Sequence, residues 1–137
     1  MKFIENLYGG SLINVAEIVS IYKVGCYNTY FPYRHTFNNV KGIGVYAALK
    51  IGQNCHSLPV VTMNDITSLA DFDLSGSELE RYLHLLQTEA EQYSLVTEIF
   101  DELMCRIQKP TVFVDTWDVV LTCIRKRNEK LSEQDCD

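Results

Sequence analysis

The sequence has no long run of apolar residues. Its N-terminal stretch, MKFIENLYGG, is interrupted by Glu5, Asn6 and a pair of glycines, so it lacks the continuous apolar segment of a secretory signal. No later stretch approaches the ~20 apolar residues that a membrane-spanning helix needs. These two absences predict a cytoplasmic protein with no membrane partner.

Closely spaced cysteines are lacking as well. The chain has five cysteines, an odd number at unrelated spacings, and none of them forms a CxxC pair. A disulfide framework would leave one cysteine over, and structural zinc sites normally use closely spaced ligand pairs. We therefore expect free thiols, no metal and no cofactor. The cysteines are Cys26, Cys55, Cys105, Cys123 and Cys136.

Composition indicates a folded chain with one core. Apolar residues make up 47% of the 137 residues and charged residues 22%, which is close to the average for folded proteins. This length is too short for two ordinary domains. We expect a single domain over 1–137, mainly β over 1–72 and mainly α over 73–132, with a frayed tail at 133–137.

Charge is distributed unevenly along the chain, whose net charge is −6. Residues 1–63 carry five basic and two acidic side chains, residues 64–108 carry two basic and ten acidic ones, and residues 109–137 carry five basic and six acidic ones. The first part is therefore mildly basic and the middle is strongly acidic. Such polarity can steer a charged partner, but it does not determine the fold.

The first half has the pattern of β-strands joined by turns. Residues 11–24, SLINVAEIVSIYKV, are rich in β-branched side chains and alternate with period two, and the glycines before them indicate a hairpin with residues 2–7. Two further strands are predicted over 42–52 and 55–62, joined by a Gly-Gln-Asn turn. Pro59 places the last strand at an edge or a bend, because proline cannot donate to a strand ladder. The prediction is an α+β fold in which a small antiparallel sheet, or a partly open barrel, packs against C-terminal helices.

The next segment has the pattern of a helix. Ser77 and Glu80 form a capping-box motif, and apolar residues then recur at alternating spacings of four and three. This heptad pattern could form a homo-oligomer through the 79–107 helix. Its flanking positions carry no opposite charges and are partly apolar, so we expect the helix, or a pair broken near Ser94, to pack on its own sheet. The heptad residues are Leu79, Leu83, Leu86, Ala90, Tyr93, Thr97, Phe100, Met104 and Ile107.

Pro110 ends this helix, and a short strand and a last helix are expected after it. Residues 111–114, TVFV, form the strand candidate, and Asp115 can cap a helix with one apolar face. Residues 118–124 are also β-branched, so they could instead continue the strand.

No motif specifies a reaction, and we expect no catalytic residue. Cys55 and His56 are adjacent, but neighbouring side chains of a strand point to opposite faces, so a catalytic thiol would need His35 or His84. The glycines of KGIGVY lack the third glycine of a dinucleotide loop and precede a strand, which predicts a hairpin feature.

The charged clusters have structural explanations. Two acidic pairs fall where solvent-facing or helix-capping acids are expected. A basic cluster lies near the end of the last helix, where cations favour the helix dipole. Four cations without interleaved aromatic residues match a nucleic-acid site poorly. These groups are Asp71/Asp73, Asp101/Glu102, and Arg125-Lys126-Arg127 with Lys130.

An aromatic segment, CYNTYFPYRHTF at 26–37, is the leading candidate for a binding site. Its rings could fold inward and close one end of the sheet, because a tyrosine hydroxyl can stay in water. Tyrosine and arginine are also enriched at interface hot spots, which favours an exposed protein-binding loop. A third interpretation combines the rings with Lys23, Lys41 and Lys50 as a stacking platform for single-stranded nucleic acid. The candidate binding residues are Tyr27, Tyr30, Phe31, Tyr33, Arg34 and His35.

A pattern is formed by Gly10 and Gly52, by Asn14, and by the isoleucines Ile13, Ile18, Ile21 and Ile66. On this pattern, residues 9–70 resemble the small FlbD-like proteins. In that family a turn glycine, a strand, an Asn followed by an Ile-x-x-Ile pair, a hairpin and a brief helix succeed one another. This chain departs from the pattern by inserting the aromatic segment through Val40 and by adding the helical half. The resemblance implies a small β module with a regulatory, non-enzymatic role, and it supplies no catalytic residue.

The leading hypothesis is a non-enzymatic protein-binding or regulatory domain that uses residues 26–37 and the neighbouring sheet edge. A second hypothesis is an acidic inhibitor or immunity-type protein, whose 64–108 region covers the basic site of a toxin or nuclease. A third is single-stranded nucleic-acid binding, and a fourth is a thiol-dependent enzyme.

Overall fold

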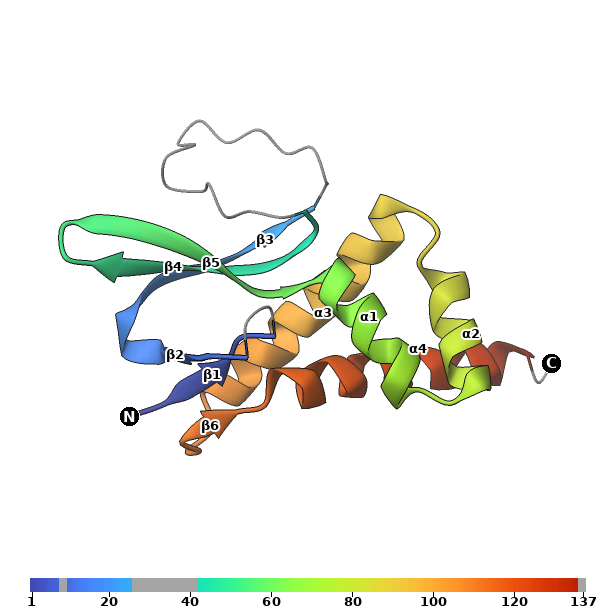
Figure 1. The fold of residues 1–137 in the computed structure, drawn as a ribbon. Coiled ribbons are helices and arrows are strands. Elements are labelled where there is room, and N and C mark those ends of the chain that lie inside the picture. Colours follow the sequence, from blue (N-terminus) through green and yellow to red (C-terminus); the bar gives the residue numbers. More distant parts are fainter. Residues whose placement is uncertain (8–9, 26–41, 136–137) are drawn as a thin grey trace.

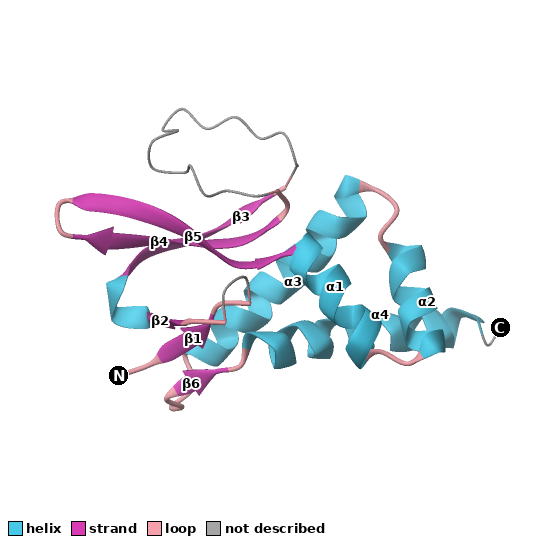
Figure 2. Cartoon of the chain, viewed as in Figure 1, coloured by secondary structure: helices cyan, strands magenta, loops and turns pink. Residues whose placement is uncertain are grey.

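A computed structural model describes residues 1–7, 10–25 and 42–135, and within these residues the chain forms two three-stranded sheets and four α-helices (Figure 1). The predicted α+β class is confirmed, and the described strands do not close into a barrel. Figure 2 shows both sheets on one side of the molecule and α1, α2 and most of α4 on the other. The elements are β1 Phe3–Glu5, β2 Leu12–Asn14, the 3-10 helix η1 Val15–Glu17, β3 Ile18–Val24, β4 Gly44–Ile51, β5 Asn54–Thr62, α1 Met63–Asp73, α2 Gly76–Leu85, α3 Glu89–Ile107, β6 Phe113–Val114 and α4 Thr116–Asp135.

The first sheet joins the start of the chain to its C-terminal third. Its strand order is β2-β1-β6, with β1 antiparallel to β2 and parallel to β6. Ile4 is opposite both Ile13 and Val114, and all three side chains are buried in the core. Because side chains alternate across a strand, their neighbours in sequence lie on the other face of this sheet.

The strand predicted over 11–24 is divided between the two sheets. It is interrupted by η1, whose N-terminus is capped by Asn14: the side-chain oxygen accepts the Ala16 N–H at 3.0 Å. The chain then enters the second sheet as β3. Local capping by an asparagine therefore overrides the strand pattern at this point.

The second sheet is an antiparallel meander in the order β3-β4-β5, and the predicted β4–β5 hairpin is confirmed. Gly52 has the positive φ, +64°, that the tight turn between these strands requires. Pro59 lies on β5, at the sheet edge, next to a register shift opposite Val45 and Tyr46. The central strand β4 is buried on both faces from Gly44 to Leu49.

Gly44 lies where two backbones meet. A Cβ atom added to it would lie 2.9 Å from the Thr62 Cα and would collide with the Val61 carbonyl oxygen. Gly44 is therefore a close-packing position at the start of β4.

The helix predicted to begin at Ser77 begins two residues earlier, and it is shorter than expected. Ser75 is the N-cap of α2, and its capping box is completed by Glu78, not by Glu80. Thr88 caps α3, so the chain breaks at residues 86–88, between two separate helices, rather than near Ser94. The sequence contains two overlapping Ser-x-x-Glu motifs. The one that caps α2 ends at Glu78, whose carboxylate also contacts Arg125 of α4.

The heptad pattern does not mark the buried face of α3. The residues of α3 that are fully buried are Leu95, Val96, Ile99 and Leu103, whereas the heptad residues are half-buried or exposed. Val96 and Leu103 belong to the apolar flank of the pattern. The expected packing of the helix within its own chain is confirmed, because α3 contacts both sheets and α4.

Lys2 ties the first strand to the end of α3. Its Nζ atom donates to the carbonyl oxygens of Ile107 at 2.7 Å and Arg106 at 3.3 Å, and also to that of Lys109. Arg106 and Ile107 are the last two residues of α3, where a helix leaves carbonyls without a partner four residues further on. The Lys2 side chain therefore points toward α3, away from the open face of the first sheet.

The last helix is α4, and the idea of a continued strand over 118–124 is wrong. Asp115 caps it as predicted, with its Oδ1 accepting the Asp118 N–H at 3.1 Å. The helix continues to Asp135, into the segment expected to be frayed, and its last turn carries no basic residue. Since the basic cluster lies well before that end, the helix dipole does not account for it.

Candidate interaction surface

The residues predicted to bind a partner lie outside the described part of the chain. They are Tyr27, Tyr30, Phe31, Tyr33, Arg34 and His35, and all of them fall within 26–41. Lys41 lies there too, so the stacking platform is also outside the described residues. The aromatic-segment hypothesis stays a prediction.

The described part of the chain offers no assembled thiol site. Cys55 and His56 are consecutive on β5, opposite Lys50 and Leu49, so their side chains leave opposite faces of the strand. His84 lies on α2, in a cleft whose described lining contains no cysteine. Burial raises the pKa of Cys123 to about 11, and the nearby carboxylates add to this effect. A thiol with such a pKa is protonated at neutral pH and is a poor nucleophile.

Alkylation should follow this difference between the thiols. In the folded chain, iodoacetamide at about pH 8 is expected to modify the exposed Cys55 and Cys105 and to leave the buried Cys123 unmodified. Peptide mass spectrometry over time measures each rate, with the urea-unfolded chain as the control for intrinsic reactivity. Fast modification of Cys123 would contradict the prediction, and a thiol faster in the folded than in the unfolded chain would support the thiol-enzyme hypothesis.

Two arginines of the basic cluster form ion pairs within the fold. Arg125 Nε lies 3.3 Å from a Glu78 oxygen on α2, and Arg127 Nε lies 2.7 Å from a Glu98 oxygen on α3. Arg127 also donates to Ser94 Oγ at 2.7 Å. These contacts hold α4 against α2 and α3. They also partly neutralise the acidic middle of the chain, which leaves less free charge for a nucleic acid or for a basic toxin.

The acidic pairs have the surface and structural positions that the sequence predicted. Asp73 accepts a hydrogen bond from Trp117 Nε1, and Glu102 forms an ion pair with Arg106 at 3.1 Å. Asp71 is exposed, and so is Asp101. Among the described residues, no group of three or more His, Cys, Asp or Glu side chains is arranged to hold a metal ion.

A cleft of about 430 Å³ between α2 and α4 contains polar side chains that could be taken for a catalytic set. It is lined by Ser77, Glu80, Arg81, His84 and Leu131. Ser77, Glu80 and His84 are exposed, and no hydrogen bond joins these side chains in the described chain. A nucleophile and its base are activated by such contact, and the described side chains of this cleft show no assembled pair of that kind.

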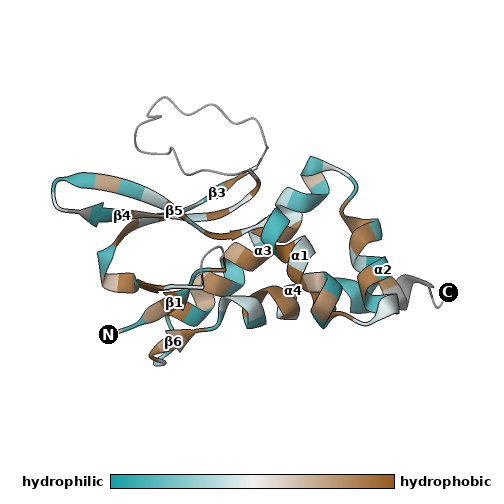
Figure 3. Ribbon diagram, in the orientation of Figure 1, coloured by the Kyte–Doolittle hydropathy of each residue, from teal (hydrophilic) through white to brown (hydrophobic). Residues whose placement is uncertain are grey.

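The first sheet has an open face with apolar side chains, and this face is the best-formed candidate site. Phe3 of β1 is opposite Phe113 of the parallel strand β6, and Leu12 lies diagonally from Phe3 across the hairpin. Figure 3 shows hydrophobic residues on both β1 and β6. We call this set the outer face; it comprises Phe3, Glu5, Leu12, Asn14 and Phe113.

Exposed apolar side chains concentrate around the outer face. Among the described residues, seven large hydrophobic side chains are exposed, and four of them belong to this part of the molecule. Leu12 is 56% exposed and Phe113 is 45% exposed, although the opposite side of the same strands is in the core. Clustered exposed apolar residues on a small protein are typical of interaction sites. The four are Met1, Leu12, Val112 and Phe113, and the remaining three, Val19, Phe72 and Leu83, lie on three other elements.

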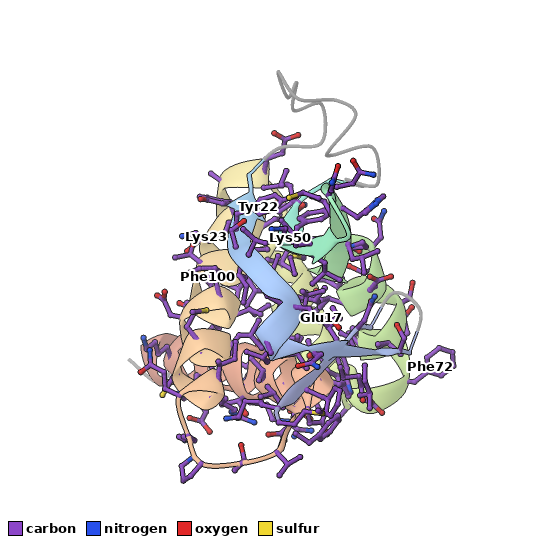
Figure 4. All side chains as sticks on the ribbon, turned by 90° about the vertical axis from the view of Figure 1, so that its left-hand side faces the viewer. Glu17, Tyr22, Lys23, Lys50, Phe72 and Phe100 are labelled. Carbon is purple, nitrogen blue, oxygen red and sulfur yellow. The ribbon has the colours of Figure 1, made fainter. Side chains whose placement is uncertain are left out.

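The edges of the second sheet are less suited to binding by strand addition. Figure 4 shows Lys23 of the edge strand β3 beside Phe100 of α3. Its Nζ atom lies 5.2 Å from the centre of the Phe100 ring and 5.5 Å from that of Tyr93. Inward-pointing lysines, bulges and prolines protect edges against strand pairing, and β3 and β5 have all three: β3 also has a register shift between Ile18 and Ser20, and β5 contains Pro59.

Comparison with protein-family models, curated proteins and solved structures found no match. The resemblance to FlbD-like proteins therefore stays a prediction, although its residues have clear local roles, such as the cap at Asn14 and the turn at Gly52. In the part of the chain that the structure describes, no helix is both long and apolar enough to cross a membrane.

Sequence reasoning missed the outer face because its two halves are far apart in the chain. Residues 2–7 and 111–114 were both predicted as strands, but nothing in either segment indicates that they are neighbours. The only feature that the two segments share is a phenylalanine followed by a β-branched residue, Phe3-Ile4 and Phe113-Val114, which is too common to predict a pairing.

Proposed function

We propose that this protein is a non-enzymatic protein-binding domain and that the outer face of the first sheet is its binding surface. The observation that carries the proposal is the concentration of exposed Phe113, Leu12, Val112 and Met1 on and beside one sheet face. Keeping these side chains in water has a cost of about 25 cal/mol per Å² of apolar surface, which a partner would remove on binding. Phenylalanine and leucine on a short, three-stranded sheet also form a rigid surface, which limits the entropy lost when a partner binds.

The test compares two double variants of the full chain in affinity capture from a native lysate. Leu12→Thr with Phe113→Thr removes the apolar side chains of the outer face and keeps residues that favour strands. Val19→Thr with Phe72→Gln is the matched control, because it removes apolar side chains elsewhere that are at least as exposed.

The expected result is that the wild type and the control capture the same protein, and that the outer-face variant captures it at least about tenfold less, as expected for hot-spot residues. Calorimetry with the purified partner then gives the affinities. Equal capture by the two double variants would contradict the proposal. A third bait with Tyr30, Phe31 and Arg34 replaced by alanine tests the aromatic segment separately, and loss of capture by that bait alone would assign binding to residues 26–37.

The acidic-inhibitor function is the second candidate. Exposed acids on three helices favour it: Asp71, Glu80, Glu89 and Asp101. The ion pairs of Glu78, Glu98 and Glu102 with arginines of the same chain count against it. In the capture experiment, reversal of the four exposed acids to lysine would abolish binding of a basic partner if this candidate is correct, and the outer-face variant would bind normally.

A further inference from the structure

The outer face has a carboxylate pair on one side of its Phe3–Phe113 pair, with Leu12 directly opposite Glu5. Glu5 follows Ile4 at the end of β1, and Asp115 follows Val114, the last residue of β6, so each carboxylate is one residue beyond a cross-strand pair. Glu5 lies on the same face of β1 as Phe3, because residues two apart in a strand share a face. The pKa of Glu5 is raised by its burial and by the charge of Asp115, which is consistent with two carboxylates close together.

This carboxylate pair lacks a cation in the described chain. Neither Glu5 nor Asp115 forms an ion pair among the described residues. Asp115 uses one oxygen to cap α4, which leaves the other oxygen available. The nearest basic side chain in sequence, Lys2, donates to the carbonyls at the end of α3 and points away from this face.

The same charges disfavour a second copy of the chain as the occupant. A second copy would place an outer face that has no basic side chain against the Glu5–Asp115 pair, in a chain that already carries a net charge of −6. Like charges facing each other across an interface select against that pairing.

The following inference rests on the proposed function. We infer that the partner is a protein segment that places apolar side chains on Phe3, Leu12 and Phe113, and a lysine or arginine on the Glu5–Asp115 pair. The apolar contact supplies most of the affinity. The cation offsets the repulsion between the two carboxylates. It also fixes the orientation of the segment on the face, because the carboxylates lie on only one side of the Phe3–Phe113 pair.

The test is selection of a random peptide library, displayed on phage, on three forms of the immobilised full chain. They are the wild type, the apolar variant Leu12→Thr with Phe113→Thr, and the charge variant Glu5→Gln with Asp115→Asn. Both charge substitutions keep the shape of the side chain, and asparagine is as good an N-cap for α4 as aspartate. Circular dichroism of all three confirms that the fold is intact.

The wild type is expected to enrich peptides in which apolar residues stand at a fixed spacing from Lys or Arg, and the charge variant to enrich the apolar residues without the basic one. A synthetic peptide from the wild-type selection should bind the charge variant about fivefold more weakly, a difference that added salt reduces. Peptides without a basic position on the wild type would overturn this inference and leave the proposed function standing. If the wild type enriches no peptide, both this inference and the proposed function are overturned. If sedimentation shows that the wild type is a dimer and that the apolar variant is a monomer, the occupant is a second copy of the chain and this inference is overturned.

Discussion

Gly44→Ala is expected to lower the free energy of unfolding by about 3 kcal/mol or more, which is at the upper end of the cost of overpacking a core. The added methyl group would meet the Val61 carbonyl oxygen and lie 2.9 Å from the Thr62 Cα. Both neighbours are backbone atoms of β5, paired in register with β4, so they cannot move aside as a flexible side chain would. Urea denaturation followed by circular dichroism measures the loss.

Gly76→Ala is the matched control for this substitution. An added Cβ at Gly76 has no atom within 4 Å, and the residue is the first of α2, where alanine favours the helix. We expect this variant to gain about 0.4–1 kcal/mol, chiefly because the unfolded chain loses conformational freedom. If the two variants were equally stable, β4 and β5 would not approach each other as closely as described.

Leu103→Ala is expected to lower the free energy of unfolding by about 3–5 kcal/mol, whereas Leu83→Ala should lower it by less than about 1 kcal/mol. Leu103 is fully buried on α3, and its truncation leaves a cavity in the core. Leu83 is 45% exposed on α2. The two substitutions remove the same atoms, so the comparison isolates burial.

This pair of variants also tests the coiled-coil interpretation of the heptad pattern. Leu83 is a heptad position and Leu103 is a flanking one, so a dimer through the 79–107 helix predicts the opposite order of stabilities. Denaturation at several protein concentrations separates the two cases, because the stability of a dimer rises with concentration. A larger loss from Leu83→Ala, together with concentration dependence, would restore the homo-oligomer.

Much of the fold could be predicted because its signals are local. The β4–β5 hairpin follows from alternating side chains around Gly52, the edge position of β5 from Pro59, and the start of α4 from Asp115. Each of these depends on the conformational limits of one residue. Segments whose structure is determined by the conformational preference of one residue were therefore predicted as the correct type of element.

The boundaries of α2 and the buried face of α3 depend on contacts that are distant in sequence. Ser75 and Ser77 both begin a Ser-x-x-Glu motif, and Glu78 also pairs with Arg125, a residue of α4. That ion pair and the hydrogen bonds from Ser75 hold the pKa of Glu78 below its ordinary value. Similarly, the heptad pattern gave the right periodicity for α3 but the wrong face, because the neighbouring sheet and α4 determine which side is covered.

The candidate surface was the least predictable part. The sequence pointed to residues 26–37, which lie outside the described residues, and their role stays a prediction. The outer face requires Phe3 and Phe113 to be neighbours. The parallel pairing of a three-residue strand with a two-residue strand far away in the chain produces no recognisable pattern in the local sequence.

The pairing of β1 with β6 also affects the order in which parts of the chain fold. Contacts between residues 3–5 and 113–114 close a loop that contains most of the chain, and such non-local contacts form late because the entropy of loop closure opposes them. During synthesis the β1–β2 hairpin can form early, but Ile4 lacks the strand beside it until Val114 has left the ribosome. The surface that we propose for binding therefore forms only after residues 113–114 have emerged, so a partner that recognises it would not bind nascent chains that lack them.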